Sequence, residues 1–476
     1  MKGVDKESGS VSEATSDVKE LRGNMGSYND DEEKVTDQLL DRTDSGTPPS
    51  DKYYMVYLMM TMLGLGQLLP WNFFITANEY FTYKLRNTSH NASIYEVDDK
   101  TYLQITFENW FSVTSMVTNV VFVFVTSSIM HTLCANVRMF GAMSTMVVLF
   151  ILTVIFTQVD TDSWQVAFFV ITVLTVGILS SACAVIQASL FGLAGFFPQK
   201  YTSGVMAGQA IAGMFASLAS IITLLGTQDD PLQSGFNYFL AATFAILIAI
   251  VSYLAIPRTD FGHYYLQHPD ERTSDHLIAA KQAKGSGIGV KKEKPPFIAI
   301  FKKVKMEALS VWMVFFVTLS LFPPLTSNVQ SVNKDSGTRW TNQFFIPVYC
   351  FLMFNVGDLI GRVVAAFIQW PRRGSYLLPL LCILRVGFIP LFLLCNIQPR
   401  GTIPVIFNTD IYPVVFMLLF ATTNGYLASL CMMYGPQQAP QQFVETGGAI
   451  CATFLTFGLA VGSAFSILLV SFIISV

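Results

Sequence analysis

Long apolar stretches, separated by short polar connections, run along the chain from residue 54 to its last residues. Each has about 20 residues or more, the length that an α-helix needs to cross a roughly 30 Å hydrocarbon core. The pattern predicts an all-α polytopic membrane protein with eleven transmembrane helices, six before a polar break and five after it. We expect the six at 54–82, 107–130, 137–158, 165–194, 202–225 and 234–256, and the five at 307–332, 343–370, 376–395, 411–434 and 444–474.

Two polar segments flank these groups of helices. Residues 1–52 are rich in Ser, Asp, Glu and Gly and lack an apolar core, so we expect a disordered cytosolic tail rather than a cleavable signal peptide. Residues 257–306 are basic and contain closely spaced glycines, which is typical of a flexible cytosolic linker. The expected domains are therefore an N-terminal bundle over 53–256 and a C-terminal bundle over 307–476.

Composition excludes a water-soluble fold. Hydrophobic residues make up 52 % of the chain and charged residues 13 %, about half the charged share of a soluble domain. The seven cysteines form no CxxC pair, so a disulfide framework is not expected. P-loop, HExxH and GxSxG motifs are missing, which disfavours an ATP-driven pump or an enzyme. We expect no cofactor, no metal site and no nucleic-acid partner; the lipid bilayer is the expected surrounding.

Basic residues predict the orientation, because Lys and Arg accumulate in cytosolic loops. With the N-terminus cytosolic, the inside loops carry fourteen basic residues and the outside loops six. The C-terminus then lies on the lumenal or extracellular side. Two glycosylation sequons, at Asn87 and Asn91, lie in the predicted outer loop 83–106 and support this topology.

Two basic residues, Arg362 and Arg385, fall within predicted spans, and Asp358 is the carboxylate expected deep in one. Charges in the membrane interior cost at least ~2.5 kcal/mol each, so they need a partner or a function. Helical spacing places Asn355, Asp358 and Arg362 on one stripe, where the two charges can neutralise each other and still bind a ligand. The alternative is a buried ion pair that fixes helix packing or a cytoplasmic gate.

Further polar and aromatic side chains interrupt the apolar spans. Trp71 offers a flat face for a planar ligand, although packing or interface anchoring is the commoner role of such an aromatic residue. Gln187 can donate and accept at a nucleobase edge, or form an ordinary interhelical hydrogen bond. Gly204, Gly208 and Gly213 are expected to permit close helix packing.

The chain resembles the equilibrative nucleoside transporters over nearly all of residues 53–476. Ordered motifs carry the resemblance, at Leu68–Phe74, Gln187–Gly195, Phe344–Pro347, Phe354–Arg362, Leu394–Asn396, Asn424–Leu427 and Tyr434–Pro436.

Within that family the chain is most similar to the endolysosomal, third member, at Lys84–Asn87, Asp160–Trp164 and Asn333–Gly337. Leu39 and Leu40 resemble that member's dileucine sorting signal, which binds a sorting adaptor, but Val35 stands four residues before Leu39, where the signal carries an acid. We therefore expect a late endosomal or lysosomal membrane, with the plasma membrane as the alternative.

The resemblance implies a fold like that of the major facilitators, with the solute bound between a six-helix and a five-helix bundle that rock to expose it alternately. It implies that Asp358 and Arg362 hold the ribose hydroxyls and that Gln187 bonds the base. It further implies an apolar pocket for the base, lined by Leu68, Trp71, Met116 and Leu459. Inhibitor-sensitive members have a glycine where this chain has Cys183.

These features predict facilitative transport of nucleosides such as adenosine and uridine, with a possible dependence on pH. The alternatives are a proton-coupled nucleoside or nucleobase symporter, in which Asp358 titrates, and a multipass receptor or membrane enzyme that does not transport.

Overall fold

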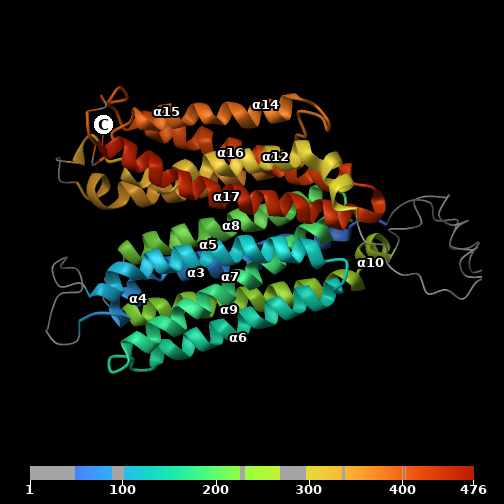
Figure 1. Ribbon diagram of the computed structural model, residues 1–476, viewed down its shortest axis with the longest axis horizontal. Coiled ribbons are helices and arrows are strands. Elements are labelled where there is room, and N and C mark those ends of the chain that lie inside the picture. Colours follow the sequence, from blue (N-terminus) through green and yellow to red (C-terminus); the bar gives the residue numbers. More distant parts are fainter. Residues whose placement is uncertain are drawn as a thin grey trace, which may run out of the picture. The chain divides into compact units, whose positions relative to one another are not determined.

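The computed structural model describes residues 49–87, 101–225, 231–267, 296–334, 338–398, 400–402 and 404–475. Most of the predicted tail, with Leu39 and Leu40, lies outside the described residues, as does the sequon at Asn91. Asn87, at the edge of a described segment, is half-buried. The described chain is almost entirely helical, which confirms the predicted fold class (Figure 1).

Helices α3 to α9 form the N-terminal bundle, coloured blue to yellow-green in Figure 1. Polar groups fix the start of its first helix, because both carboxylate oxygens of Asp51 accept backbone N–H groups of the first turn, from Val56 and Tyr57. The helices are α3 (Met55–Thr76), α4 (Asn78–Lys84), α5 (Tyr102–Ile129), α6 (Ala135–Gln158), α7 (Gln165–Gly195), α8 (Gln199–Leu225) and α9 (Pro231–Ala255).

Helices α12 to α17 form the C-terminal bundle, coloured yellow to red in Figure 1. Its ninth predicted span is broken into two short α-helices around a single 3₁₀ turn. The elements are α12 (Phe297–Leu321), η6 (Trp340–Phe344), η7 (Pro347–Leu352), α13 (Met353–Phe367), α14 (Leu377–Leu384), η8 (Arg385–Gly387), α15 (Phe388–Leu393), α16 (Ile411–Gln438) and α17 (Val444–Ser475).

Nine helices in the described parts of the chain are long and apolar enough to cross a membrane. The other two predicted spans correspond to α3 and to the shorter apolar stretch Leu377–Leu393. A multipass membrane protein is therefore confirmed, and the exact count of eleven stays a prediction.

Residues 257–306 contain more helix than a flexible linker implies. Helix α10 (Asp260–Gln267) follows α9, and α12 (Phe297–Leu321) begins ten residues before its predicted span. Lys302 and Lys303 in this early part of α12 are exposed, so the helix begins in a polar environment and continues into an apolar one. We call this side of the bundles the linker end and the opposite side, which carries α4, the sequon end (Figure 1).

Two pairs of helices cross unusually closely because glycines face the neighbouring backbone. A Cβ atom added to Gly208 on α8 would lie 2.0 Å from the carbonyl oxygen of Thr61 on α3, which agrees with the predicted packing role. A Cβ atom on Gly425 of α16 would lie 2.0 Å from the carbonyl oxygen of Asp358 on α13. Side chains near Asp358 can therefore reach across to α16 over a short distance.

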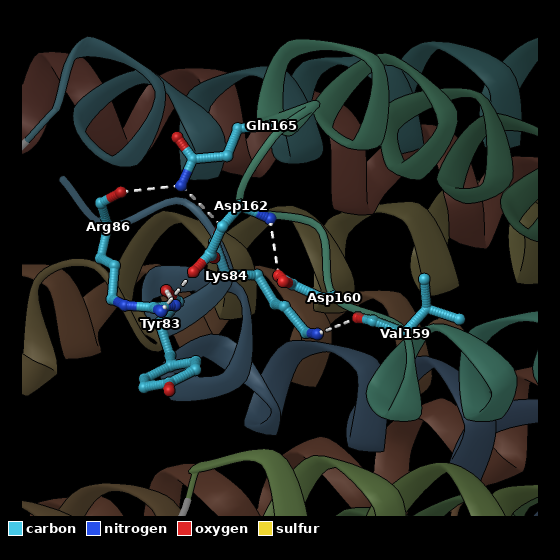
Figure 2. Close-up of polar contacts among 7 residues, drawn as sticks. All are labelled: Tyr83, Lys84, Arg86, Val159, Asp160, Asp162 and Gln165. Atoms are coloured by element: carbon cyan, nitrogen blue, oxygen red, sulfur yellow. Dashed lines mark hydrogen bonds and ion pairs between the residues drawn. The ribbon is translucent and has the colours of Figure 1, made fainter. Parts of the chain in front are cut away.

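A cluster of polar contacts at the sequon end joins the segment after α4 to the connection between α6 and α7 (Figure 2). Arg86 pairs with Asp162 at 2.7 Å, and Nζ of Lys84 donates to the carbonyl of Val159 at 2.7 Å. The amide of Gln165 donates to the carbonyls of Lys84 and Arg86, at 3.2 and 2.8 Å. Burial lowers the pKa of Lys84. We call these five residues the sequon-end clasp.

Gln165→Ala should destabilise the protein by about 1–2 kcal/mol, because it leaves two carbonyls of the clasp without their donor. Thermal unfolding of the detergent-purified protein measures the effect. The matched control is Gln158→Ala at an exposed position of α6, which should leave the midpoint nearly unchanged. Equal midpoints for the two variants would show that the clasp does not contribute to stability.

Candidate functional site

Asp358 and Arg362 form an ion pair one helical turn apart on α13, as their spacing predicts. Nε of Arg362 donates to Oδ2 of Asp358 at 2.7 Å. Asp358 is 3 % exposed and Arg362 6 %. Charges buried this deeply are stable only when they are paired and their remaining polar atoms are hydrogen-bonded. The partners of those remaining atoms therefore identify the residues that support the pair.

The guanidinium of Arg362 connects α13 to α8, which belongs to the other bundle. Its Nη1 donates to the carbonyl of Met206 at 2.8 Å and to Oε1 of Gln209 at 3.3 Å. The amide of Gln209 in turn donates to Oε1 of Gln67 on α3 at 2.9 Å. The ion pair consequently lies at the interface between the two bundles.

Two asparagines complete the polar contacts around the pair, one within the C-terminal bundle and one across the interface. Nδ2 of Asn424 on α16 donates to the second carboxylate oxygen of Asp358 at 2.7 Å. The amide of Asn355 donates to Oγ of Ser217 on α8 at 2.9 Å. Asn355 and Arg362 thus both contact α8, which agrees with the predicted stripe. Both oxygens of Asp358 accept from protein groups and the pair is buried; we call this arrangement the closed conformation.

Gln187 also links the two bundles. It is 7 % exposed, and its Nε2 donates to Oγ1 of Thr456 on α17 at 3.2 Å. This is the interhelical hydrogen bond that the sequence left as an alternative to base recognition. In the closed conformation, the amide donor of Gln187 is therefore bonded to the opposite bundle.

Trp71 lies against Phe111 of α5, with ring centroids 5.1 Å apart and an interplanar angle of 23°. Its flat face is thus stacked on an aromatic ring. Leu68 and Leu459 are half-buried and pack with Trp71 against the same apolar core, and Met116 is half-buried on α5.

The described hydrogen bonds and ring contacts join Asp358 to Arg362 but do not join that pair to Trp71, Gln187 or Met116. The predicted site residues are therefore contributed by helices of both bundles.

Arg138 and Glu445 form a second ion pair between the bundles, at the linker end. Nη2 of Arg138 at the start of α6 bonds Oε1 of Glu445 at the start of α17, and Arg138 is 5 % exposed. The two residues lie 307 positions apart. Arg138 was predicted to lie in a cytosolic loop, so its pairing with Glu445 was not expected.

A second buried carboxylate, which the sequence did not single out, lies in the C-terminal bundle. Glu307 lies inside the long helix α12 and is 4 % exposed. One of its oxygens accepts from Nε2 of Gln438 at 3.0 Å, and the other has no hydrogen-bond partner among the described residues. A cavity of about 130 Å³ lies beside it, lined in part by Ser310 and Tyr376.

Comparison with known proteins determines the family. A family model described as "Nucleoside transporter" matches residues 171–471. Equilibrative nucleoside transporter 1 from Homo sapiens is 38 % identical over 88 % of this chain and 98 % of its own length. The chain belongs to the nucleoside transporter family.

Two other relatives in this family are similar to a comparable degree. Equilibrative nucleoside transporter 2 from Rattus norvegicus is 36 % identical over 89 % of this chain and 98 % of its own length. Equilibrative nucleoside transporter 3 from the same organism is 34 % identical over 93 % of this chain and 94 % of its own length. The third member is thus among the relatives, and percentage identity does not separate it from the others. All three are named as transporters, and the protein is not an enzyme.

Solved structures support the fold of this nucleoside transporter family member. The proton:xylose symporter XylE, of the major facilitator superfamily, matches 87 % of each chain with a TM-score of 0.53 and 14 % identity. The Escherichia coli fucose:proton symporter FucP matches 90 % of this chain and 98 % of its own, with a TM-score of 0.50 and 10 % identity. These likenesses confirm the predicted major-facilitator-like architecture.

Reversing one charge at the linker end, in Arg138→Glu or Glu445→Arg, should destabilise the protein by about 2 kcal/mol or more, because two like charges then meet at a largely buried position. The double reversal should recover part of this loss, as measured by thermal unfolding. Arg86→Glu and Asp162→Arg at the more exposed sequon-end pair form the control, with smaller effects. Additive effects of Arg138→Glu and Glu445→Arg would contradict a direct interaction.

Proposed function

We propose that the protein is a facilitative nucleoside carrier that works by alternating access, so that substrate moves down its own gradient and no bond is made or broken. One observation carries the proposal: in a member of the nucleoside transporter family, a buried carboxylate–guanidinium pair bridges the two helical bundles. Such a pair offers acceptors and donors together, which suits the vicinal hydroxyls of ribose.

Recognition of the ribose depends on exchanging protein partners for substrate partners. In the closed conformation Asn424 donates to Asp358, while Arg362 donates to Gln209. A ribose hydroxyl donates to a second lone pair of the carboxylate, beside Asn424, and a ribose oxygen accepts from the guanidinium in place of Gln209. This exchange keeps the buried charges satisfied, and it is selective because an analogue without hydroxyls leaves them unpaired.

We propose that the nucleobase binds between Trp71 and the amide of Gln187, with Leu68, Met116 and Leu459 as apolar walls. Phe111 occupies the face of Trp71 in the closed conformation, so the proposed stacking requires a shift of that ring. The amide of Gln187 exchanges its bond to Thr456 for a bond to the edge of the base.

Alternating access requires contacts between the bundles that can be broken at modest cost. At the centre these are the hydrogen bonds of Arg362 to α8 and of Gln187 to α17. At the linker end the ion pair Arg138–Glu445 adds a further contact. We propose that opening at the linker end separates this pair, while substrate replaces the central partners.

We further propose a late endosomal or lysosomal membrane as the location, with the N-terminus cytosolic, the C-terminus lumenal, glycans at Asn87 and Asn91, and an adaptor bound at Leu39 and Leu40. The motifs at Lys84–Asn87, Asp160–Trp164 and Asn333–Gly337, which resemble the endolysosomal member, support the location.

Flux of labelled adenosine and uridine into proteoliposomes tests the transport proposal. The wild type should equilibrate both nucleosides across the membrane. Asp358→Ala should reduce flux by roughly tenfold or more, since it removes acceptors worth about 1.5–3 kcal/mol. Trp71→Ala and Gln187→Ala should cause smaller losses. Binding of adenosine without flux would favour a receptor instead.

An imposed pH gradient distinguishes facilitative from proton-coupled transport. We expect adenosine inside the vesicles to rise to the external concentration and to stop there, because no second solute supplies energy. A transient accumulation above the external concentration, lost in Asp358→Asn, would contradict facilitation and support a symporter in which Asp358 carries the proton.

A further inference from the structure

Arg385, the second basic residue that the sequence places in a span, is one of the most completely buried side chains of the C-terminal bundle. It is 2 % exposed. Its Nη1 donates to the carbonyl of Phe420 at 2.8 Å, and its guanidinium lies over the ring of the same residue, 4.7 Å from the centroid. Among the described carboxylates, none forms an ion pair with Arg385. A buried guanidinium supported by neutral groups is costly, so its position calls for an explanation.

The second nitrogen of Arg385 starts a chain of hydrogen bonds that ends on Asp358. Nη2 donates to Oγ1 of Thr318 on α12 at 2.9 Å. Oγ1 of Thr318 lies 2.6 Å from Oδ1 of Asn424, to which it donates, and Nδ2 of Asn424 donates to Oδ1 of Asp358 at 2.7 Å. We call Arg385, Thr318 and Asn424 the relay.

The relay has one direction, and the charges at its two ends impose it. A guanidinium can only donate and a carboxylate can only accept, so Nδ2 of Asn424 faces Asp358 and Oδ1 of Asn424 faces Thr318. The one hydroxyl proton of Thr318 is shared between Oδ1 of Asn424 and the carbonyl of Val314, which lies 2.7 Å from Oγ1. Thr318 and Asn424 are 2 % and 1 % exposed, so water does not compete. Hydrogen bonds aligned in this way strengthen one another in a low-dielectric interior.

We propose that Arg385 is a positioning residue for ribose recognition and that it acts through Thr318 and Asn424. The relay orients the carboxylate of Asp358 from the side opposite to Arg362, so that Oδ1 and Oδ2 are held by different helices. This inference rests on the proposed function, in which Asp358 receives the ribose hydroxyls. Arg385 itself does not touch the substrate.

Thr318→Val tests the relay because it removes the hydroxyl link and leaves both charges in place. We expect the KM for uridine to rise about fivefold or more, with little change in maximal rate and no change in the KM for 2′,3′-dideoxyuridine, which lacks the hydroxyls. Thr318→Ser keeps the hydroxyl and should restore the wild-type KM. Equal effects on both substrates would overturn the proposal.

Thr423→Val is the matched control. Thr423 also bonds the guanidinium of Arg385, through Nη1, but it lies outside the relay, so neither KM should change. If Thr423→Val also raises the uridine KM selectively, then loss of any hydrogen bond to Arg385 has this effect. That result would overturn the specific role of the relay. If Thr318→Val does not fold, Thr318→Ala removes the same hydroxyl without placing a methyl group beside the guanidinium.

Asp358→Asn, assayed in parallel, distinguishes a failure of the relay proposal from a failure of the ribose assignment. If it raises the KM for uridine selectively while Thr318→Val does not, the relay proposal fails and the ribose assignment stands. If Asp358→Asn leaves the preference for uridine over the dideoxynucleoside unchanged, the ribose assignment itself fails.

Discussion

A carboxylate and a guanidinium removed from water must have every strong donor and acceptor satisfied, and this constraint organises the centre of the molecule. Asp358 and Arg362 neutralise each other, and their remaining groups bond α8 on one side and α16 on the other. A guanidinium N–H group of Arg362 that donates to protein in the closed conformation can donate to substrate in a conformation that is open to it. The same requirement that stabilises the pair therefore makes it suitable for recognising a sugar.

Close helix crossings make this arrangement possible. Glycines at the α13–α16 contact bring the backbones of Asp358 and Gly425 together, so that the short side chain of Asn424 reaches the carboxylate. On the other side, the long side chain of Arg362 extends to α8. The two bundles also share an apolar core, and polar contacts join them at Arg362, at Gln187 and at the ion pair Arg138–Glu445. Alternating access requires these contacts to separate as the bundles move.

The sequence was sufficient to predict a multipass helical membrane protein and the ion pair. The lengths of the apolar stretches predict membrane helices, and charges four residues apart in one of them predict the pairing of Asp358 with Arg362. Contacts between distant segments were not predictable. Arg138 was counted as a loop charge although it pairs with Glu445, and no sequence pattern indicates that Arg385 contacts Thr318 or that Thr318 contacts Asn424. Helix α12 begins before its predicted span because a helix can continue beyond the apolar region with its lysines exposed.

A structure determined with adenosine bound tests the role of the central pair most directly. We expect a ribose hydroxyl within about 3 Å of the carboxylate of Asp358, with Asn424 still donating to Oδ1 and Gln209 moved from its position in the closed conformation. Adenosine bound elsewhere, with Asp358 and Arg362 still closed in by the same protein partners, would contradict the assignment of the pair to substrate recognition.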